Sequence, residues 1–503
     1  MSILLTLPTL SPSVRELFDK AANSFNPAML GRSTPKALDK NDNQEAQGYQ
    51  DSGKSQNSDK LTAKNYSVTK LLSKTVLSYK PIALYQQHTL HYALKTIGYL
   101  PTPLLEALVS YLKGPTSKQY LHANAHLRLI IAVNAKLKTP LQLSELIGLR
   151  KRFAVDAVAM QAPKVWRQGR VNFIKNFNPI TKHSFAPVSW QDKVIANADD
   201  SDMNIRCYSA GTDCSNGSGK ANDNVNNYNR DQVVMLFLHG GGFCIGDTDT
   251  HHEFCHAICA QTGWPIVSVD YRLAPEHPVP TALRDSIAAY AWLSEHCHML
   301  GAQPSRIVLA GDSAGGCLTS MLAQQVADPT QTPWLDLGLQ GQKTLNLLQS
   351  LPPPLAQMPI YPVTDVETDY PSWSLYGEGL LLDHADIAVF DAACLQYSKL
   401  SREHPLLSPM IGNNEKVCPT FIVAAELDVL RDQAFAYAKQ LTYYGVAVQV
   451  QTILGAPHGF IHFMSVHKGI EQETRHIIKA FEQFVYRVLS IQKVQSAQNT
   501  LAA

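Results

Sequence analysis

The chain has 503 residues, of which 45% are hydrophobic and 17% charged, so it can bury a sizeable core and is not globally disordered. Its 43 Lys and Arg residues nearly balance 42 Asp and Glu residues, which gives no sign of a nucleic-acid binder. No stretch approaches the roughly 18 apolar residues that span a bilayer, and residues 1–8 lack the basic region of a secretory signal. Nine cysteines without a repeated spacing indicate free, buried thiols. These features predict a cytoplasmic protein.

The N-terminal third of the chain contains two stretches of different composition. Residues 1–65 are expected to be a flexible tract, because residues 33–65 are rich in Asn, Gln, Ser, Asp and Lys and contain almost no large apolar side chains. Residues 66–185 are expected to form a helical extension or cap, with helices near 104–113, 120–138 and 141–157. Between residues 66 and 182 there are 17 Lys or Arg residues and only three acids. The near-neutral total therefore conceals a basic extension and an acidic remainder.

Short apolar runs alternate with helical segments between residues 186 and 490. Strands are expected at residues 233–238, 266–269, 307–310, 357–361, 421–425 and 448–454. Most of these runs are continuously apolar, which is typical of a mostly parallel sheet covered by helices on both faces. The pattern predicts an α/β, doubly wound catalytic domain whose functional residues follow the carboxyl ends of strands. The polar tract 209–231 predicts a long loop, residues 328–354 an insertion, and residues 491–503 a C-terminal tail.

The strongest local motif is Gly311-Asp312-Ser313-Ala314-Gly315, which lies between a predicted strand and a predicted helix. This arrangement is typical of a nucleophile elbow, in which a sharp turn between small residues exposes a serine hydroxyl above the sheet edge. The competing interpretation is a glycine-rich turn that happens to contain a serine. The flanking strand and helix favour Ser313 as a nucleophile.

A second motif, His239-Gly240-Gly241-Gly242-Phe243, directly follows the strand predicted at 233–238. Consecutive glycines let the backbone approach a substrate closely and present its N–H groups to a developing negative charge. We expect Gly241, Gly242 and Ala314 to form an oxyanion hole. A phosphate-binding turn is the alternative, but the chain lacks the lysine and hydroxyl residue of that motif here.

A serine nucleophile also needs a base and an acid that orients the base. Asp428 follows the strand predicted at 421–425, and His458 follows the one at 448–454, in the chain order Ser, Asp, His that a nucleophile elbow requires. Glu426 and Asp432 lie in the same loop as Asp428 and are the competing candidates for the acid.

These motifs together resemble the hormone-sensitive-lipase family of α/β hydrolases, which includes bacterial esterases and lipases. The resemblance covers about residues 187–487 and rests on five segments: residues 239–243, 270–278, 311–316, 426–432 and 457–460. It implies an α/β-hydrolase fold without a cofactor or metal, Ser313 as nucleophile, Asp428 as acid, His458 as base, and a helical cap before the catalytic domain. The chain departs from the family in its two insertions and in Gln433, where the family commonly has Glu.

Three other patterns were weighed and assigned no catalytic role. The segment 270–278 offers Glu276 and His277, but an Arg- and Pro-containing loop more often fixes a turn through charge pairing. His251, His252 and His256 are interpreted as part of a solvated helix face and not as metal ligands. Asn216-Gly217-Ser218 fits a glycosylation pattern and is expected to be only a loop.

The sequence therefore predicts a carboxylic-ester hydrolase acting on a small-molecule or lipid ester through an acyl-enzyme. An amide hydrolase with the same triad and a non-catalytic receptor of the same fold remain as alternatives, and the choice between esterase and lipase stays open. The basic segment 66–182 predicts either an ordinary cap or a surface that associates peripherally with anionic membranes. No nucleic-acid partner is expected.

Overall fold

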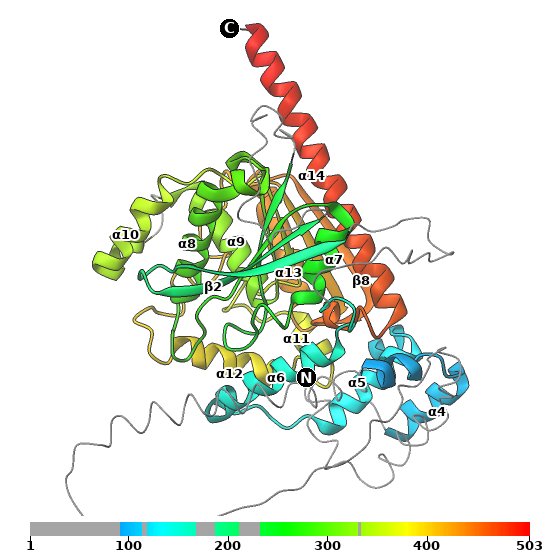
Figure 1. Cartoon of the computed structure of the whole chain (residues 1–503). Helices are drawn as coiled ribbons and strands as arrows, with labels where there is room; N and C mark the ends of the chain where they lie inside the picture. Colours follow the sequence, from blue (N-terminus) through cyan, green and yellow to red (C-terminus); the bar gives the residue numbers. More distant parts are fainter. Residues whose placement is uncertain (1–90, 113–117, 167–186, 211–231, 330–332, 503) are drawn as a thin grey trace, which may run out of the picture.

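A computed structural model of the chain describes residues 91–112, 118–166, 187–210, 232–329 and 333–502 (Figure 1). The tract 1–65, most of the polar tract 209–231 and the Asn216-Gly217-Ser218 pattern lie outside the described residues. Eight cysteines within these ranges are buried and form no disulfide with one another. In the same ranges, no helix is both long and apolar enough to cross a membrane.

The described residues form an eight-stranded sheet in the order β1-β2-β4-β3-β5-β6-β7-β8. Strand β2 runs antiparallel to both of its neighbours, and every pairing from β4 to β8 is parallel. The strands are β1 (Val188–Ala196), β2 (Asp202–Ala210), β3 (Val234–Leu238), β4 (Ile266–Val269), β5 (Ile307–Asp312), β6 (Ala356–Ile360), β7 (Thr420–Leu427) and β8 (Val448–Pro457). The predicted mostly parallel α/β sheet is confirmed.

The central strands have continuously apolar sequences because both faces of the sheet are covered. All five residues of β3 are buried. Met235 and Phe237 pack into one core, whereas Val234, Leu236 and Leu238 pack into the other. Alternate side chains of one strand thus supply two separate cores.

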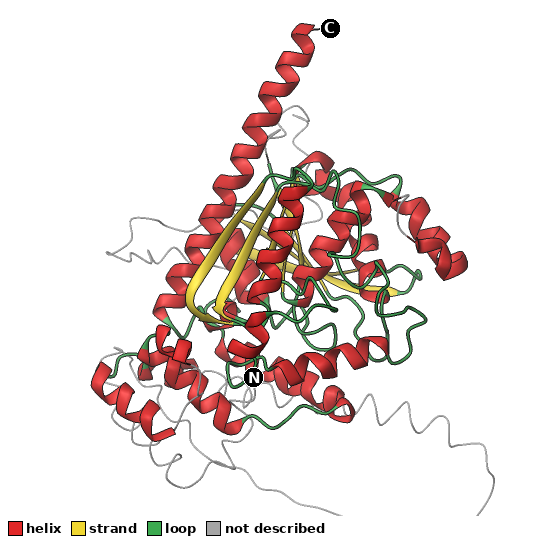
Figure 2. Ribbon diagram, turned by 180° about the vertical axis from the view of Figure 1, so that it is seen from behind, coloured by secondary structure: helices red, strands yellow, loops and turns green. Residues whose placement is uncertain are grey.

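Helices cover the sheet in two layers (Figure 2). Residues of α7 and α14 join the first core, and residues of α8, α9 and α13 join the second. These helices are α7 (His252–Thr262), α8 (Thr281–His296), α9 (Ala314–Ala327), α13 (Arg431–Tyr443) and α14 (Lys468–Ala502). Helix α14 remains helical beyond residue 490, and Figure 1 shows it projecting past the body of the protein.

The basic extension contributes α4 (Thr102–Leu112), η2 (Lys118–His122), α5 (Ala125–Leu137), η3 (Leu143–Glu145) and α6 (Leu146–Met160). The helix expected at 120–138 is interrupted, because the Asn124 side chain accepts the Leu127 N–H at 2.9 Å and starts a new helix there. Figure 1 shows these helices at one end of the sheet, together with α11 (Pro371–Tyr376) and α12 (His384–Leu395).

The predicted insertion 328–354 contains η7 (Pro333–Leu337) and α10 (Gly338–Leu348) among its described residues. Trp334 is fully buried in the second core, and its Nε1 donates to Gln325 Oε1 at 2.8 Å. This part of the insertion is therefore packed against α9.

Candidate active site

Ser313 lies in the sharp turn between β5 and α9. Its φ of 53° and ψ of −119° place a non-glycine residue in a strained conformation. The Ser313 N–H donates to Ile360 O at 2.8 Å, which holds the turn against β6. The side chain is only 8% exposed.

The small residues around Ser313 are required by close packing against β3. A Cβ on Gly311 would lie 2.4 Å from Gly315 O, and one on Gly315 would lie 2.0 Å from Leu238 O. Neither position has space for a side chain. The residue types of the motif thus follow from the approach of two adjacent strand ends.

His458 connects Ser313 to Asp428 through hydrogen bonds. Its Nε2 lies 2.9 Å from Ser313 Oγ, and its Nδ1 lies 2.8 Å from Asp428 Oδ2. Asp428 is fully buried, and its other oxygen accepts the Leu430 N–H at 2.9 Å. With its Nδ1 proton directed to Asp428, the ring offers an unprotonated Nε2 to the serine hydroxyl.

The other two acids of the Asp428 loop point elsewhere. Glu426 lies 2.9 Å from His122 Nδ1 in the extension and accepts the Gly455 N–H at 2.6 Å. Asp432 accepts the Ser372 N–H at 2.9 Å and pairs with Arg431. Neither contact reaches His458.

Residues 239–243, here called the glycine loop, continue from β3 beside Ser313. The φ angles of Gly241, Gly242 and Phe243 are 123°, 58° and 60°, so three consecutive residues have positive φ. A Cβ on Gly242 would lie 2.5 Å from the ring of Phe390 in α12. Ala314, the first residue of α9, adds a backbone N–H that has no partner within the helix.

Two buried ionisable groups, the Asp312 carboxylate and the His239 ring, lie at the start of the glycine loop. The Asp312 carboxylate accepts the Gly240 N–H at 2.8 Å and lies 3.1 Å from His251 Nε2. Burial alone would raise the pKa of Asp312, but the neighbouring His251 and the Gly240 N–H hold it at about 2. Burial, with a contribution from His251, lowers the pKa of His239 to about 4, so this ring is neutral at pH 7. An anionic carboxylate and a neutral imidazole therefore support the loop.

The prediction of a solvated face for His251, His252 and His256 is wrong, because the first two are buried and the third is partly buried. His251 and His252 are 1% and 0% exposed, because α7 begins against the sheet and residues 165–166 cover His252. His251, Asp312 and His462 place potential ligand atoms within 4.8 Å of one another. Asp312 Oδ1 already accepts the Gly240 N–H and lies 3.1 Å from His251 Nε2, so we describe this group as a buried cluster of two histidines and a carboxylate and assign no metal to it.

The segment 270–278 is held by charge pairing, as the sequence suggests. Arg272 Nη2 lies 2.7 Å from the fully buried carboxylate of Asp285. Glu276 pairs with Arg150 of α6 at 2.9 Å.

Comparison with known proteins decides the family. A family model described as alpha/beta hydrolase fold matches residues 235–462. "Lipase 2" of Moraxella sp. (strain TA144) is 52% identical over 430 residues, which cover 84% of this chain and 95% of that protein. The chain belongs to the hormone-sensitive-lipase-like family of α/β hydrolases.

More distant similarities are also to an ester hydrolase and to a solved esterase. "Carboxylic ester hydrolase LipN" of Mycobacterium tuberculosis is 34% identical over 51% of this chain and 64% of that protein. The solved esterase of Pyrobaculum calidifontis superposes with a TM-score of 0.55 at 22% identity, covering 72% of this chain and 99% of that one. The latter similarity supports the α/β-hydrolase fold.

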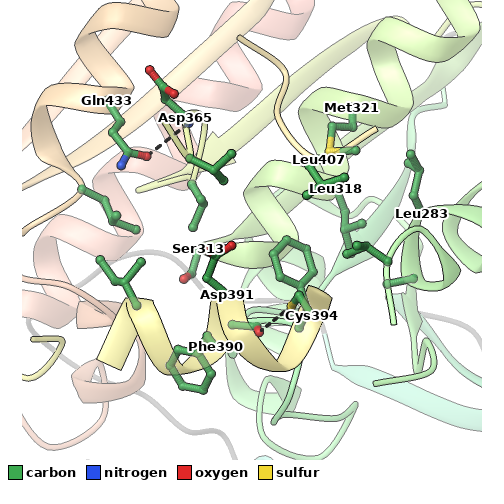
Figure 3. A pocket seen from close by; sticks show the side chains of 18 of the residues that line it. Leu283, Ser313, Leu318, Met321, Asp365, Phe390, Asp391, Cys394, Leu407 and Gln433 are labelled. Atoms are coloured by element: carbon green, nitrogen blue, oxygen red, sulfur yellow. Dashed lines mark hydrogen bonds between the residues drawn. The ribbon is translucent and has the colours of Figure 1, made fainter. Parts of the chain in front are cut away.

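The hydrolase has a mainly apolar pocket beside Ser313. Figure 3 shows two sides of this pocket, with α12 running past Ser313. One side is lined by Leu283, Leu318, Met321 and Leu407, and the other includes Asp365 and Gln433. Gln433 Oε1 accepts the N–H groups of Thr364 and Asp365, at 3.1 and 3.3 Å. The uncharged amide at this position is thus used to fix a pocket loop.

Proposed function

We propose that this α/β hydrolase cleaves carboxylic esters with Ser313 as nucleophile, His458 as general base and Asp428 as the orienting acid. The observation that carries the proposal is the hydrogen-bonded series from Ser313 through His458 to the buried Asp428, beside an apolar pocket. The similarity to lipases and carboxylic ester hydrolases supports an ester as the substrate.

The reaction proceeds in two steps. His458 Nε2 takes the proton of Ser313 as the oxygen attacks the acyl carbonyl, and Asp428 stabilises the imidazolium that forms. His458 then returns the proton to the leaving alcohol, which leaves an acyl group on Ser313. Water attacks this acyl-enzyme by the same route and restores the serine.

The oxyanion of each tetrahedral intermediate is bound by the N–H groups of Gly241, Gly242 and Ala314. These donors belong to backbone that is fixed before substrate arrives, so no reorganisation is needed during the reaction. Loss of one such donor typically costs about 3–4 kcal/mol of transition-state stabilisation.

The acyl part of the substrate is apolar. Leu283, Leu318, Met321 and Leu407 offer it an aliphatic lining, and such surface favours burial of hydrocarbon by about 25 cal/mol for each Å². Ester and amide substrates are distinguished by comparing hydrolysis of p-nitrophenyl butyrate with that of butyryl p-nitroanilide, which share the acyl group. We expect rapid hydrolysis of the ester only; faster hydrolysis of the anilide would contradict the proposal.

We also propose that the basic segment 66–182 associates peripherally with anionic membranes. On α6, Ile147 and Val155 are 53% and 54% exposed and flank the exposed Lys151 at four-residue spacing, as on an interfacial helix. Lys95 and Lys136 are also exposed. Other cations of the extension bind acids of this chain, as Lys138 does with Asp383 at 2.7 Å.

Co-sedimentation of the full chain with vesicles tests this association. Phosphatidylserine-containing vesicles should retain the protein at low salt, phosphatidylcholine vesicles should not, and salt should release it because charges are screened beyond about 10 Å at 0.1 M. Combined substitution of Ile147→Ser, Lys151→Gln and Val155→Ser should weaken retention. No retention of the unsubstituted chain at low salt would refute the association.

A further inference from the structure

Arg150 of α6 makes four hydrogen bonds with segments far away in the sequence. Its Nε donates to Cys244 O at 2.8 Å and its Nη2 to Ala274 O at 3.0 Å. The same guanidinium forms a two-point pair with the Glu276 carboxylate, at 3.0 and 2.9 Å. One side chain of the N-terminal extension thus joins two loops of the catalytic domain.

Both backbone carbonyls that accept from Arg150 lie next to the glycine loop. The N–H groups of Cys244 and Ile245 both donate to Gly241 O at 3.0 Å, so the loop folds back on itself just before the Arg150 contact. The Ala274 N–H donates to Phe243 O at 2.9 Å. Arg150 therefore binds the residue that follows the loop and the residue that pairs with the end of the loop.

Apolar packing fixes the position of α6 on these segments. Leu146 and Phe153 of α6 belong to a buried cluster with Cys244, Ile245 and Ala274. At the end of the helix, Gln161 Nε2 donates to the carbonyl oxygens of residues 249 and 250, at 2.8 and 3.0 Å. Helix α6 and the residue that follows it thus contact both the segment after the glycine loop and the segment before α7.

The glycine loop needs such external support because of its backbone conformation. Gly241, Gly242 and Phe243 all have positive φ, which is unfavourable for Phe243 in particular. Conformations of this kind persist only where the surrounding structure determines them. Glycine adopts positive φ without strain at positions 241 and 242, so the residue that most depends on support from neighbouring segments is Phe243.

We propose that Arg150 is a positioning residue, which holds the glycine loop in the conformation that binds the oxyanion. The inference rests on the proposed function, in which Gly241 and Gly242 are the donors. It gives the N-terminal extension a part in catalysis, although no residue of α6 touches the reacting atoms.

A guanidinium suits this position better than an ammonium group. Its donors lie in one plane in a fixed fork, so they meet two carbonyls and a carboxylate at once. The hydrogen bond from Arg150, against the opposing effect of burial, holds the pKa of Glu276 below its usual value, which keeps the carboxylate charged at neutral pH. Lysine at this position would retain the charge without the fork.

The experiment compares Arg150→Met, Arg150→Lys and Glu276→Gln in the full chain. The matched control is Arg475→Met on α14, because Arg475 pairs with Glu471 at 3.0 Å and its side chain is 29% exposed, against 28% for Arg150. Three quantities are measured for each variant: kcat and KM for p-nitrophenyl butyrate, the inhibition constant of butylboronic acid, and the melting temperature. The boronate mimics the tetrahedral intermediate and places an oxygen at the oxyanion position.

For Arg150→Met we expect kcat to fall about 10- to 100-fold, because a small displacement of preorganised donors has effects of this size. KM should change less than about two-fold, since ground-state binding is intact. The boronate inhibition constant should rise by about the factor by which kcat/KM falls. The kcat of Arg150→Lys should lie between those of Arg150→Met and the wild type. The kcat of Glu276→Gln should fall less than that of Arg150→Met, and the kcat of Arg475→Met should equal that of the wild type.

Several results would overturn the proposal. One is a lower melting temperature of Arg150→Met without a change in kcat or in boronate inhibition, which would make the contact merely structural. Another is a loss in Glu276→Gln equal to that in Arg150→Met, which would assign the effect to the ion pair. If Arg150→Met does not fold, wild-type kcat and boronate inhibition in Arg150→Lys would refute the proposal. Absence of ester hydrolysis in the wild type would instead refute the proposed function.

Discussion

The Asp312 carboxylate accepts the backbone N–H of Gly240 at 2.8 Å, and this bond joins the turn that carries Ser313 to the glycine loop. The two residues lie at the ends of β5 and β3, which are adjacent parallel strands. A side chain on Gly240 would collide with Asp312, because its Cβ would lie 2.5 Å from Oδ2. This buried contact therefore helps to position the nucleophile and its oxyanion donors relative to each other.

Gly242→Ala should impair the chemical step more than the fold. The added methyl group would meet the ring of Phe390, and the φ of 58° is unfavourable for alanine, so the loop must move. We expect kcat to fall about 100-fold, as for loss of an oxyanion donor. Gly263→Ala is the control, because its φ is also positive, 72°, but nothing lies within 4 Å of the new Cβ. Equal kcat values for the two variants would show that Gly242 is not near the oxyanion.

Asp428→Asn should lower kcat by about 10⁴-fold, because an amide at this position favours the wrong tautomer of the histidine. Glu426→Gln and Asp432→Asn serve as controls, since their carboxylates bind groups other than His458. Steady-state kinetics on p-nitrophenyl butyrate measures all three. A greater loss of kcat in Glu426→Gln than in Asp428→Asn would show that Glu426, and not Asp428, is the orienting acid.

Met321→Trp should shift the preferred acyl chain toward shorter lengths. Met321 lies eight residues after Ser313 on α9, about 12 Å along the helix at 1.5 Å per residue, and lines the apolar side of the pocket. A larger side chain there fills the space available to a longer acyl group. The values of kcat/KM for p-nitrophenyl acetate, butyrate, octanoate and decanoate measure the effect, with Met299→Trp at a 55% exposed site as control. An unchanged dependence of kcat/KM on acyl-chain length would show that the acyl group does not reach Met321.

Buried histidines should make the protein less stable in acid. Burial lowers the pKa to about 3 for His252 and His462 and to about 4 for His256 and His467. Below about pH 6.5 these histidines take up protons in the unfolded chain but not in the folded chain, so their contribution to the free energy of unfolding falls as pH falls from about 6.5 toward 4.

Denaturant unfolding at several pH values measures this slope in the wild type, in His256→Gln and in the control His476→Gln, whose side chain is 68% exposed. Each buried histidine contributes up to about 1.4 kcal/mol per pH unit, so His256→Gln should flatten the curve. Identical slopes in the wild type and His256→Gln would indicate that His256 is protonated in the folded state.

The sequence was sufficient for the six strands β3 to β8, but not for β1 and β2, which were not among the expected strands. Strand β3, expected at 233–238, forms at Val234–Leu238, because a continuous apolar run between polar residues has few other stable arrangements. Ser313, Asp428 and His458 each directly follow a strand, and adjacent parallel strands end at the same edge of the sheet. Strand order and motif therefore predict their proximity.

Long-range polar contacts could not be predicted in the same way. Arg150 donates to backbone carbonyls 94 and 124 residues away, and a carbonyl carries no residue-specific signal. His251 and His252 were expected in solvent, yet the partners that bury them, Asp312 and Trp166, lie far away in the sequence. Such contacts become visible only when the tertiary structure is known.

Covalent labelling of the full chain with a fluorophosphonate tests the central claim most directly. The serine oxygen displaces fluoride from phosphorus, and intact mass followed by peptide mapping identifies the residue that carries the adduct. We expect one adduct, on Ser313, with none in Ser313→Ala and a loss of ester hydrolysis on the order of 10⁶-fold in that variant. An adduct on any other residue, or ester hydrolysis by Ser313→Ala at about a tenth of the wild-type rate, would contradict Ser313 as the nucleophile.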